Sequence, residues 1–215
     1  MSSEALPAGM ILIDKPKGIT SFDVIRILRK KLGIWKIGHA GTLDPLATGL
    51  MILALGTATK KLSSYIKLDK EYSAVIEFGA VSDTYDVDGV LTPVPSAKPA
   101  SRSAIEENLK SFVGEIMQVP PIFSAKKIKG KPAYAYARAG EPIKLEPRAV
   151  TIHSIEVLSY EWPLLSVRVH CTSGTYVRSL AHDLGARLQC GGFLKELRRT
   201  KIGKFAVESA ESLQL

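Results

Sequence analysis

The segment from Gly38 to Gly49 holds the residues best suited to chemistry in this chain of 215 residues. It reads Gly-His-Ala-Gly-Thr-Leu-Asp-Pro-Leu-Ala-Thr-Gly, and Asp44 is its one carboxylate. Pro45 restricts the backbone of Asp44 to extended conformations, and Gly41 permits close approach of another backbone. A carboxylate presented in this way is ionised at neutral pH and can support a covalent intermediate. The alternative is an Asx-Pro turn with a structural role only.

Other side chains give no sign of metal, disulfide or cofactor chemistry. Cys171 and Cys190 are too few for a disulfide framework, and we expect two reduced thiols in a cytoplasmic protein. The four histidines are scattered and no Cys-x-x-Cys spacing occurs, so no zinc site is expected. A dinucleotide fingerprint and a P-loop are also absent from the sequence.

The positive charge of the chain is unevenly distributed. The net charge is +8, and residues 1–60 and 101–150 each carry more basic than acidic side chains. The basic residues cluster at Arg26–Lys36, Lys126–Arg138 and Lys195–Lys204. Such clusters attract a polyanion, so nucleic acid is the leading class of partner. A solvated basic surface without a partner is the alternative, and a membrane surface is disfavoured because no basic stretch has aromatic anchors on an amphipathic helix.

Regular elements are expected on both sides of the segment from residue 38 to 49. Gly9–Asp14 is a short apolar run before a Pro-Gly turn, which indicates a strand. Thr20 and Asp23 have capping-box spacing, and apolar residues follow at helical period until Gly33. Leu50–Leu55 is an unbroken apolar run, which predicts a buried strand. The segment is therefore a loop between a helix and a buried strand, where functional loops commonly lie.

The rest of the chain mixes strands and helices without regular alternation. The patterns predict, in order, a helix at Thr57–Lys67, a strand at Tyr72–Phe78, a helix that begins at Ser103 and stops at Gly114, strands at Val150–Tyr160 and Leu164–Cys171, and a helix at Tyr176–Leu188. Residues 118–149 are rich in proline and lysine and are expected to form a long exposed excursion. The combination favours an α+β fold with a mixed, largely antiparallel sheet and flanking helices.

The segment from residue 38 to 49 resembles the catalytic-aspartate motif of the TruB family of tRNA pseudouridine synthases. Five further segments resemble family segments in the family's order: Lys15–Ser21 the Lys-Pro-x-Gly motif, Lys70–Tyr72 the tyrosine motif, Pro120–Lys127, Gly174–Leu180 the arginine motif, and Leu197–Thr200. The resemblance spans about residues 9–205. It implies the pseudouridine synthase catalytic fold as one domain over residues 1–215, with an RNA-gripping insertion at about 118–149.

The resemblance implies an isomerase that acts on uridine 55 in the T-loop of tRNA. The family breaks the bond from C1′ to N1, rotates the base and rejoins it through C5. The reaction needs no cofactor and no metal. The target base must be flipped out of its stack, at a cost of a few kcal/mol. Recognition is then expected to rest on shape, phosphates and stacked bases of the T-arm.

Three residues take the family's catalytic positions. Asp44 is implied to be the essential carboxylate, as a nucleophile or as a base at the ribose. Arg178 is implied to pair with that aspartate, which would keep the carboxylate ionised; the alternative is a solvated arginine near a helix N-terminus. Tyr72 is implied to stack on the target base and to assist the final proton transfer, although a core aromatic on a strand is the alternative.

A larger set is implied to contact RNA. His39 corresponds to the histidine that replaces the flipped base in the T-loop stack, and Lys15 and Pro16 support the tyrosine from behind. Basic residues interleaved with aromatic ones form the insertion, with a flexible basic loop as the alternative. The RNA-binding candidates are His39, Lys15, Pro16, Phe123, Lys126, Lys127, Tyr134, Arg138, Arg198 and Arg199.

Two rival functions remain open at this point. One is a tRNA-folding chaperone in which the isomerase activity is dispensable, motivated by the large basic surface. The other is a relative that works within guide-RNA particles, for which a chain of this length leaves no room for partner-binding segments. We expect a cytoplasmic monomer that works on tRNA without a protein partner or a membrane, and without the C-terminal PUA domain of many bacterial family members.

Overall fold

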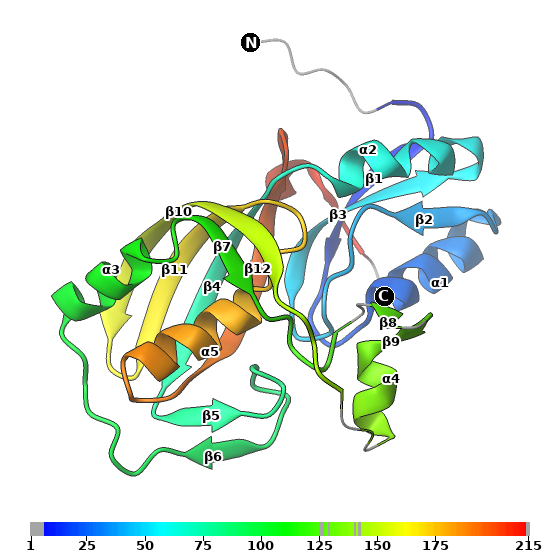
Figure 1. Ribbon diagram of the computed structural model, residues 1–215. Helices are drawn as coiled ribbons and strands as arrows, with labels where there is room; N and C mark the ends of the chain where they lie inside the picture. The colour runs from blue at the N-terminus through cyan, green and yellow to red at the C-terminus, as the bar shows by residue number, and fades with distance from the viewer. Residues whose placement is uncertain (1–6, 125–126, 129, 140, 142, 214–215) are drawn as a thin grey trace. The chain divides into compact units, whose positions relative to one another are not determined.

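The computed structural model describes residues 7–124, 127–128, 130–139, 141 and 143–213. Its residue contacts divide the chain into two compact units. The first unit comprises residues 1–72 and 198–215, and the second comprises residues 73–197. Figure 1 labels the elements of both units. Among the described residues, no helix has the length and the apolar character needed to cross a membrane.

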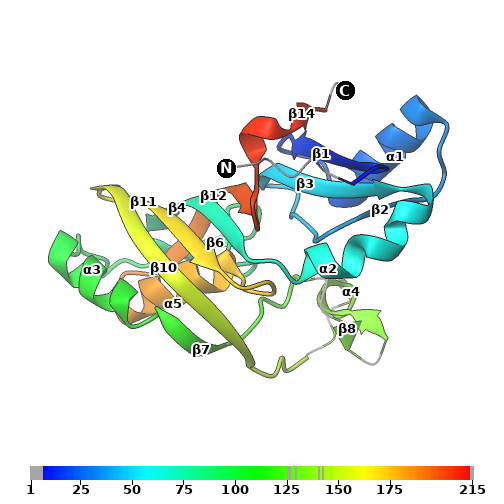
Figure 2. The same cartoon turned by 90° about the horizontal axis from the view of Figure 1, so that it is seen from above.

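The first unit is built on a mixed sheet in the order β14-β1-β3-β12. β1 pairs antiparallel with β3, whereas β14 runs parallel to β1 and β12 runs parallel to β3. β2 lies beside β3 and pairs with it (Figure 2), and β13 pairs with β12. The elements are β1 (Met10–Lys15), α1 (Ser21–Leu32), β2 (Ile37–His39), β3 (Thr48–Leu55), η1 (Gly56–Lys61), α2 (Leu62–Ile66), β13 (Phe205–Ala206), η2 (Val207–Ser209) and β14 (Glu211–Ser212), together with parts of β4 (Lys70–Phe78) and β12 (Gly192–Ile202).

Helix α1 has both of its predicted end signals. The Thr20 hydroxyl accepts from the Asp23 amide at 3.0 Å, and the Asp23 carboxylate accepts from the Thr20 amide at 2.9 Å. Gly33 takes the left-handed conformation that a helix C-terminus favours, with φ of 67°. The helix buries its apolar stripe, which includes Val24 and Leu28. These caps fix where β1 ends and where the turn into α1 begins.

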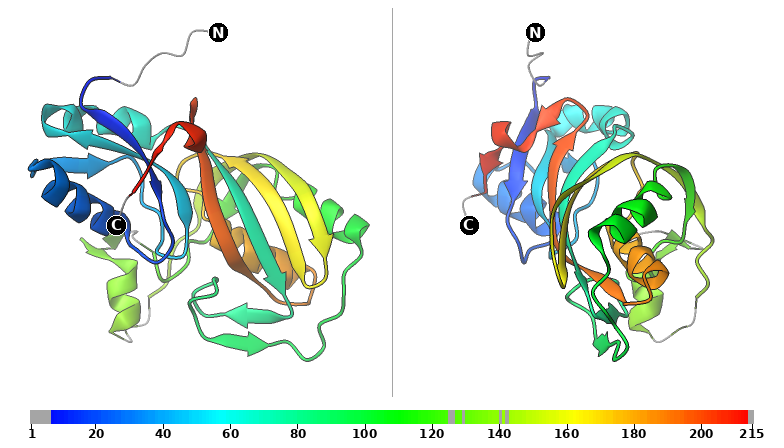
Figure 3. Two further views of the ribbon diagram at one scale, coloured as in Figure 1. Left: turned by 180° about the vertical axis from the view of Figure 1, so that it is seen from behind. Right: turned by 90° about the vertical axis from the view of Figure 1, so that its left-hand side faces the viewer.

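The second unit has a sheet in the order β12-β4-β11-β10-β7. Two helices, α3 and α5, cover one face of this sheet (Figure 3). Every second residue of β11 from Leu165 to Cys171 is buried, which is the period of a strand with one face toward a core. The elements are β5 (Ala80–Ser82), β6 (Leu91–Pro93), α3 (Arg102–Lys110), β7 (Gly114–Gln118), β8 (Lys127–Ile128), β9 (Lys131–Pro132), α4 (Ala133–Arg138), β10 (Arg148–Glu161), β11 (Leu164–Cys171) and α5 (Val177–Arg187).

The predicted α+β fold with a mixed sheet is confirmed, and the local differences have physical causes. The helix expected from residue 57 to 67 is a 3₁₀ turn followed by the short α2. The N-cap of helix α3 lies two residues earlier than expected, because Ser101 and not Ser103 accepts from the Ala104 amide. The excursion at residues 118–149 contains β8, β9 and α4. Strand β12 was not expected at all, since its charged residues were interpreted as a basic surface cluster.

Candidate active site

Asp44 lies on the loop that joins β2 to β3 in the first unit. Its neighbours Leu43, Leu46 and Ala47 are buried, whereas Asp44 itself is half-buried. The Asp44 carbonyl accepts from the Ala47 amide at 3.1 Å, which closes a turn around Pro45. Apolar anchors on both sides of the carboxylate therefore fix the loop and leave the acidic side chain partly accessible.

The turn that precedes α1 and the first residue of the helix hold this loop through its backbone. The buried Ser21 hydroxyl donates to the Leu43 carbonyl at 3.0 Å and accepts from the Leu43 amide at 2.8 Å. The Gly18 amide donates to the Pro45 carbonyl at 2.8 Å. The residues directly before and after Asp44 are thus bonded to one short stretch of the chain.

Lys15 contributes a fully buried cation beside the same loop. Its ammonium donates to the carbonyls of Pro16 and Ile19, each at 2.8 Å, and to the Pro45 carbonyl at 3.4 Å. Burial lowers the pKa of Lys15 to about 8, and the negative charge of Asp44 offsets part of that shift. The end of β1 therefore places a positive charge behind the turn that carries Asp44.

Arg199 holds the loop from the other side. This β12 residue is 1% exposed, and its guanidinium donates to the Leu50 carbonyl at 2.7 Å, the Gly41 carbonyl at 3.2 Å and the Thr42 carbonyl at 3.4 Å. It also forms a side-chain hydrogen bond with Tyr72. Arg199 thereby connects the residues before Asp44 with the tyrosine of β4.

His39 and Tyr72 are both half-buried in the first unit. Burial lowers the pKa of His39, and the charge of Arg199 adds to the effect, so the imidazole is neutral at pH 7. A neutral imidazole is suited to stacking among bases. Within the first unit, the structure therefore brings Lys15, Asp44, Tyr72 and Arg199 together as one connected group.

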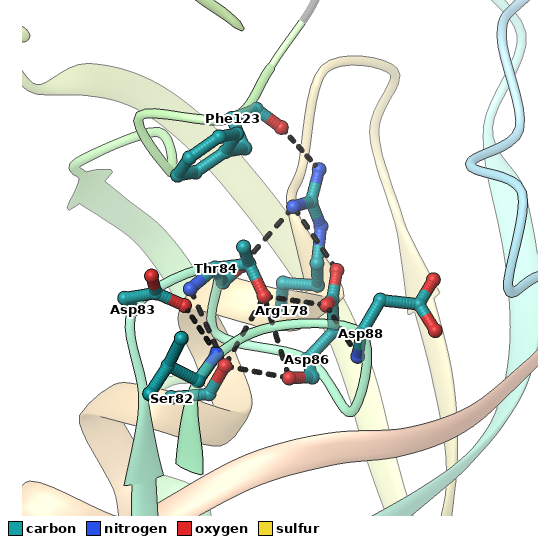
Figure 4. A network of polar contacts seen from close by, with 8 residues as sticks. Ser82, Asp83, Thr84, Asp86, Asp88, Phe123 and Arg178 are labelled. Carbon is teal, nitrogen blue, oxygen red and sulfur yellow. Dashed lines mark hydrogen bonds and ion pairs between the residues drawn. The ribbon is translucent and has the colours of Figure 1, made fainter. Parts of the chain in front are cut away.

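Arg178 occupies the first turn of α5 in the second unit. Its guanidinium lies 3.2 Å from the Asp86 carboxylate, and the two side chains are 4% and 6% exposed. It also donates to the Phe123 carbonyl at 2.9 Å and to the Thr84 carbonyl at 3.1 Å (Figure 4). A cation at a helix N-terminus is unfavourable by itself, and the Asp86 carboxylate compensates for it.

Asp86 belongs to a compact polar loop between β5 and β6 (Figure 4). The Thr84 hydroxyl donates to its carboxylate at 2.6 Å and the Asp88 amide donates at 3.1 Å. Burial raises the pKa of Asp86, while the Thr84 hydrogen bond and the Arg178 charge counteract that effect. A Cβ on Gly89 would lie 2.3 Å from a carboxylate oxygen of Asp83, so a larger residue there would displace side chains of this polar loop.

Two of the cations among the RNA-binding candidates are buried. Lys15 is 0% exposed and Arg199 is 1% exposed. Their charged groups donate to backbone carbonyls of the first unit and do not reach the surface. The Arg199 guanidinium thus donates to backbone carbonyls, which disfavours the phosphate contact expected of it, whereas the expected support of Tyr72 by Lys15 stays a prediction.

The other RNA-binding candidates stay predictions. Arg198 makes a two-pronged ion pair with Asp14, at 3.0 and 2.7 Å, and is 42% exposed. Phe123 is half-buried and contacts Arg178 through its carbonyl. Pro16 is half-buried beside Lys15. Lys126 lies outside the described residues, and for Lys127, Tyr134 and Arg138 the description extends to the backbone only, in β8 and α4.

The structure adds one residue that the sequence did not single out. Asp86 lies in the polar loop between β5 and β6, and it provides a buried carboxylate 3.2 Å from the Arg178 guanidinium. The available signal was the dense set of short polar residues from Ser82 to Gly89. Such residues often bond to nearby backbone, which closes a loop tightly enough to bury one of its carboxylates.

Comparison with known proteins gives matches along the whole chain. The model of the TruB family pseudouridylate synthase N-terminal domain matches residues 29–177, and that of the tRNA pseudouridylate synthase B C-terminal domain matches residues 178–215. The chain is 47% identical over 205 residues to tRNA pseudouridine synthase B of Chlamydia felis, which covers 94% of this chain and 86% of that protein. It is 48% identical over 202 residues to the protein of the same name from Protochlamydia amoebophila, with 94% and 76% covered.

Solved structures agree with the sequence matches. A chain of a Cbf5-Nop10-Gar1 complex aligns with a TM-score of 0.74 at 31% identity, over 95% of this chain and 52% of the other. A chain of an H/ACA RNP bound to a substrate RNA containing 2'-deoxyuridine aligns with a TM-score of 0.72 at 30% identity, over 95% and 51%. The chain thus spans about half the length of these solved chains. Together with the matching family models, these relatives show that the chain belongs to the TruB family of pseudouridylate synthases.

Proposed function

We propose that the protein converts uridine 55 in the T-loop of tRNA to pseudouridine. Support comes from relatives 46–48% identical over 93–95% of the chain, all named tRNA pseudouridine synthase B. The observation that carries the proposal is the position of Asp44, on a loop that is bonded on both sides of the carboxylate. A carboxylate on a fixed loop keeps the same position relative to a bound ribose, which favours nucleophilic attack or proton transfer.

The reaction is an isomerisation, so every atom of the uridine is retained. The bond from C1′ to N1 breaks, the base turns, a bond forms from C1′ to C5, and the proton lost from C5 is balanced by one gained at N1. Asp44 acts at the ribose, either as the nucleophile that bonds to C1′ or as the base that removes a ribose proton. Neither route needs an oxidant or a phosphate donor.

Tyr72 and Arg178 complete the proposed catalytic set. Tyr72 stacks on the extruded base, and the side-chain hydrogen bond between Tyr72 and Arg199 orients its hydroxyl. Arg178 supplies the positive charge of the family's arginine motif, and Asp86 fixes its planar guanidinium. The neutral imidazole of His39 stacks within the T-loop in place of the extruded base.

The test is incubation of an unmodified tRNA transcript with the protein, followed by chemical mapping of pseudouridine. The protein is expected to modify the T-loop uridine, and Asp44→Asn is expected to lose at least about 100-fold in rate while retaining tRNA affinity. Asp88→Asn, which alters an exposed carboxylate, is the matched control. Full activity of Asp44→Asn, or modification elsewhere in the tRNA, contradicts the proposal.

The same assay separates tRNA modification from a guide-dependent reaction. The protein is 30–31% identical to chains from H/ACA and Cbf5 complexes but 46–48% identical to the curated tRNA enzymes, which favours the tRNA reaction. Modification of naked tRNA without a guide RNA is expected. A strict requirement for added guide RNA would contradict this expectation.

A further inference from the structure

Arg199 is the largest side chain among the fully buried ones, and it lies on a strand with exposed charged neighbours. The preceding residue, Arg198, points to the accessible side and pairs with Asp14. Arg199 points inward, where its guanidinium donates to three neutral backbone carbonyls of the described residues. Burial of a charge is costly, and an apolar residue of similar volume would often be at least as stable in such a place. The cation therefore calls for an explanation beyond packing.

The hydrogen bonds of Arg199 divide into two groups. Its Nε donates to Leu50, which anchors the guanidinium to strand β3. The two terminal nitrogens donate to the carbonyls of Gly41 and Thr42, three and two residues before Asp44 respectively. The remaining contact is the hydrogen bond with the Tyr72 side chain. One planar group thus spans the loop that carries the acidic residue and the strand that carries the tyrosine.

The backbone around Arg199 is arranged for this close approach. Arg199 is paired with Gly49 between β12 and β3, and a Cβ on Gly49 would lie 2.3 Å from the Arg199 carbonyl oxygen. Gly41 has φ of 111°, in the region that favours glycine, and its carbonyl accepts from Arg199. Gly41 in the loop and Gly49 in β3 therefore allow the close approach of Arg199.

We propose that Arg199 is a positioning residue that sets the Tyr72 hydroxyl relative to the loop carrying Asp44. The inference rests on the proposed function, since it concerns the geometry of the same reaction. A lysine cannot replace the arginine, because one ammonium does not bond three carbonyls and a hydroxyl in the plane of a guanidinium. Because Arg199 is buried, its loss acts on the bound complex and not on RNA capture.

The experiment measures single-turnover rate and dissociation constant for a tRNA transcript, using Arg199→Lys, Tyr72→Phe and the double variant. Arg199→Lys is expected to lower the rate by about 10- to 100-fold, the size of effect that misplacement by a fraction of an ångström to 1 Å produces. The dissociation constant is expected to change by less than about threefold, since no phosphate contact is lost. Arg168→Lys, in an exposed ion pair with Glu156, is the matched control and keeps the wild-type rate.

The double variant separates positioning from a general structural effect. If Arg199 acts through the tyrosine hydroxyl, the two substitutions remove the same interaction. The rate of the double variant should then lie within about threefold of the rate of the slower single variant. Rate losses that multiply fully, or an Arg199→Lys rate equal to wild type, overturn the proposal. A loss explained wholly by weaker tRNA binding also overturns it.

Two further results must be distinguished from failure of this proposal: an unfolded Arg199→Lys variant, and failure of the proposed function. If Arg199→Lys does not fold, as judged by its thermal melt, Tyr72→Phe alone decides: the proposal requires at least a tenfold rate loss at unchanged affinity, and a rate within about twofold of wild type overturns it. Failure of the proposed function is recognised separately, because the wild-type protein would then form no pseudouridine in tRNA.

Discussion

The two units neutralise their buried cations in different ways. In the first unit, Lys15 and Arg199 donate to six backbone carbonyls, and three of these belong to the loop of Asp44. In the second unit, Arg178 faces a buried carboxylate, Asp86, in addition to two carbonyls. The first arrangement uses charge to hold a backbone in place. In the second arrangement, the Asp86 carboxylate fixes the position of the Arg178 guanidinium.

The difference predicts which groups suffer most when one partner is removed. A backbone carbonyl that loses its donor is a neutral polar group, and leaving it unsatisfied costs about 1–3 kcal/mol. A buried guanidinium that loses its carboxylate is an uncompensated charge, and that costs about 3–5 kcal/mol. The second unit should therefore be the more sensitive to single substitutions at its ion pair.

The largest effect is expected for Asp86→Ala. The substitution removes a buried carboxylate that lies 3.2 Å from the Arg178 guanidinium, so the free energy of unfolding should fall by about 3–5 kcal/mol. Urea unfolding of the variant measures the loss. Asp88→Ala removes an exposed carboxylate from the same loop and should cost less than about 0.5 kcal/mol. Equal losses for the two variants would show that the buried pair is not what stabilises this loop.

The next effect concerns the pH dependence that Lys15 confers. Its pKa is about 8 in the folded protein and 10.5 in the reference state, so between these values the unfolded chain binds more protons. The free energy of unfolding should therefore rise with pH across this window. The stability gained by pH 10.5 is lost again as the pH falls through about 8. The rise amounts to about 3 kcal/mol and is measured as the difference in unfolding free energy between the protein and Lys15→Met. A difference that stays flat from pH 8 to 10.5 would refute the shifted pKa.

A smaller effect is expected from closing the space beside Arg199. Gly49→Ala must place a Cβ 2.3 Å from the Arg199 carbonyl oxygen at φ of 106°. Gly18→Ala has a similar φ of 90° but meets no atom within 4 Å, so it isolates the cost of the backbone conformation. The first variant should lose about 2 kcal/mol more than the second in urea unfolding. Equal losses would mean that β3 and β12 can separate freely at this pair.

The smallest effect is expected at the exposed pair of Arg198 and Asp14. Arg198→Gln should lower the free energy of unfolding by less than about 1 kcal/mol, because exposed ion pairs contribute little. High salt should weaken the pair further. A loss as large as that of Asp86→Ala would place this surface pair among the structural ones.

Much of the fold could be predicted from local pattern. The capping box at Thr20 and Asp23, the stop at Gly33 and the buried run from Leu50 to Leu55 each depend on neighbouring residues, and all are confirmed. Local pattern was insufficient where a charge turned inward. Arg199 and Asp86 look like surface residues in sequence, because their partners are distant along the chain or hidden in a tight loop.

The loop of Asp44 shows the same limit from another side. The sequence identified the carboxylate and the glycines around it, since both have local signatures. It did not identify Ser21, Lys15 or Arg199 as the residues that hold the loop, because their partners are carbonyls, which every residue possesses. Because any residue type can provide a backbone acceptor, the sequence contains no pattern that identifies such a hydrogen bond.

The contact of Arg199 with the loop also determines when, during translation, the loop can be held in place. The hydrogen bonds from Arg199 to Thr42 and Gly41 span 157 and 158 residues. At about 5–20 residues per second, a ribosome delivers Arg199 roughly 8 to 30 seconds after Asp44. A nascent chain thus displays its acidic loop long before that loop is held, and a product cut short before residue 199 would never acquire a locked one. The loop of Asp44 is therefore among the last parts of the protein to become functional during translation.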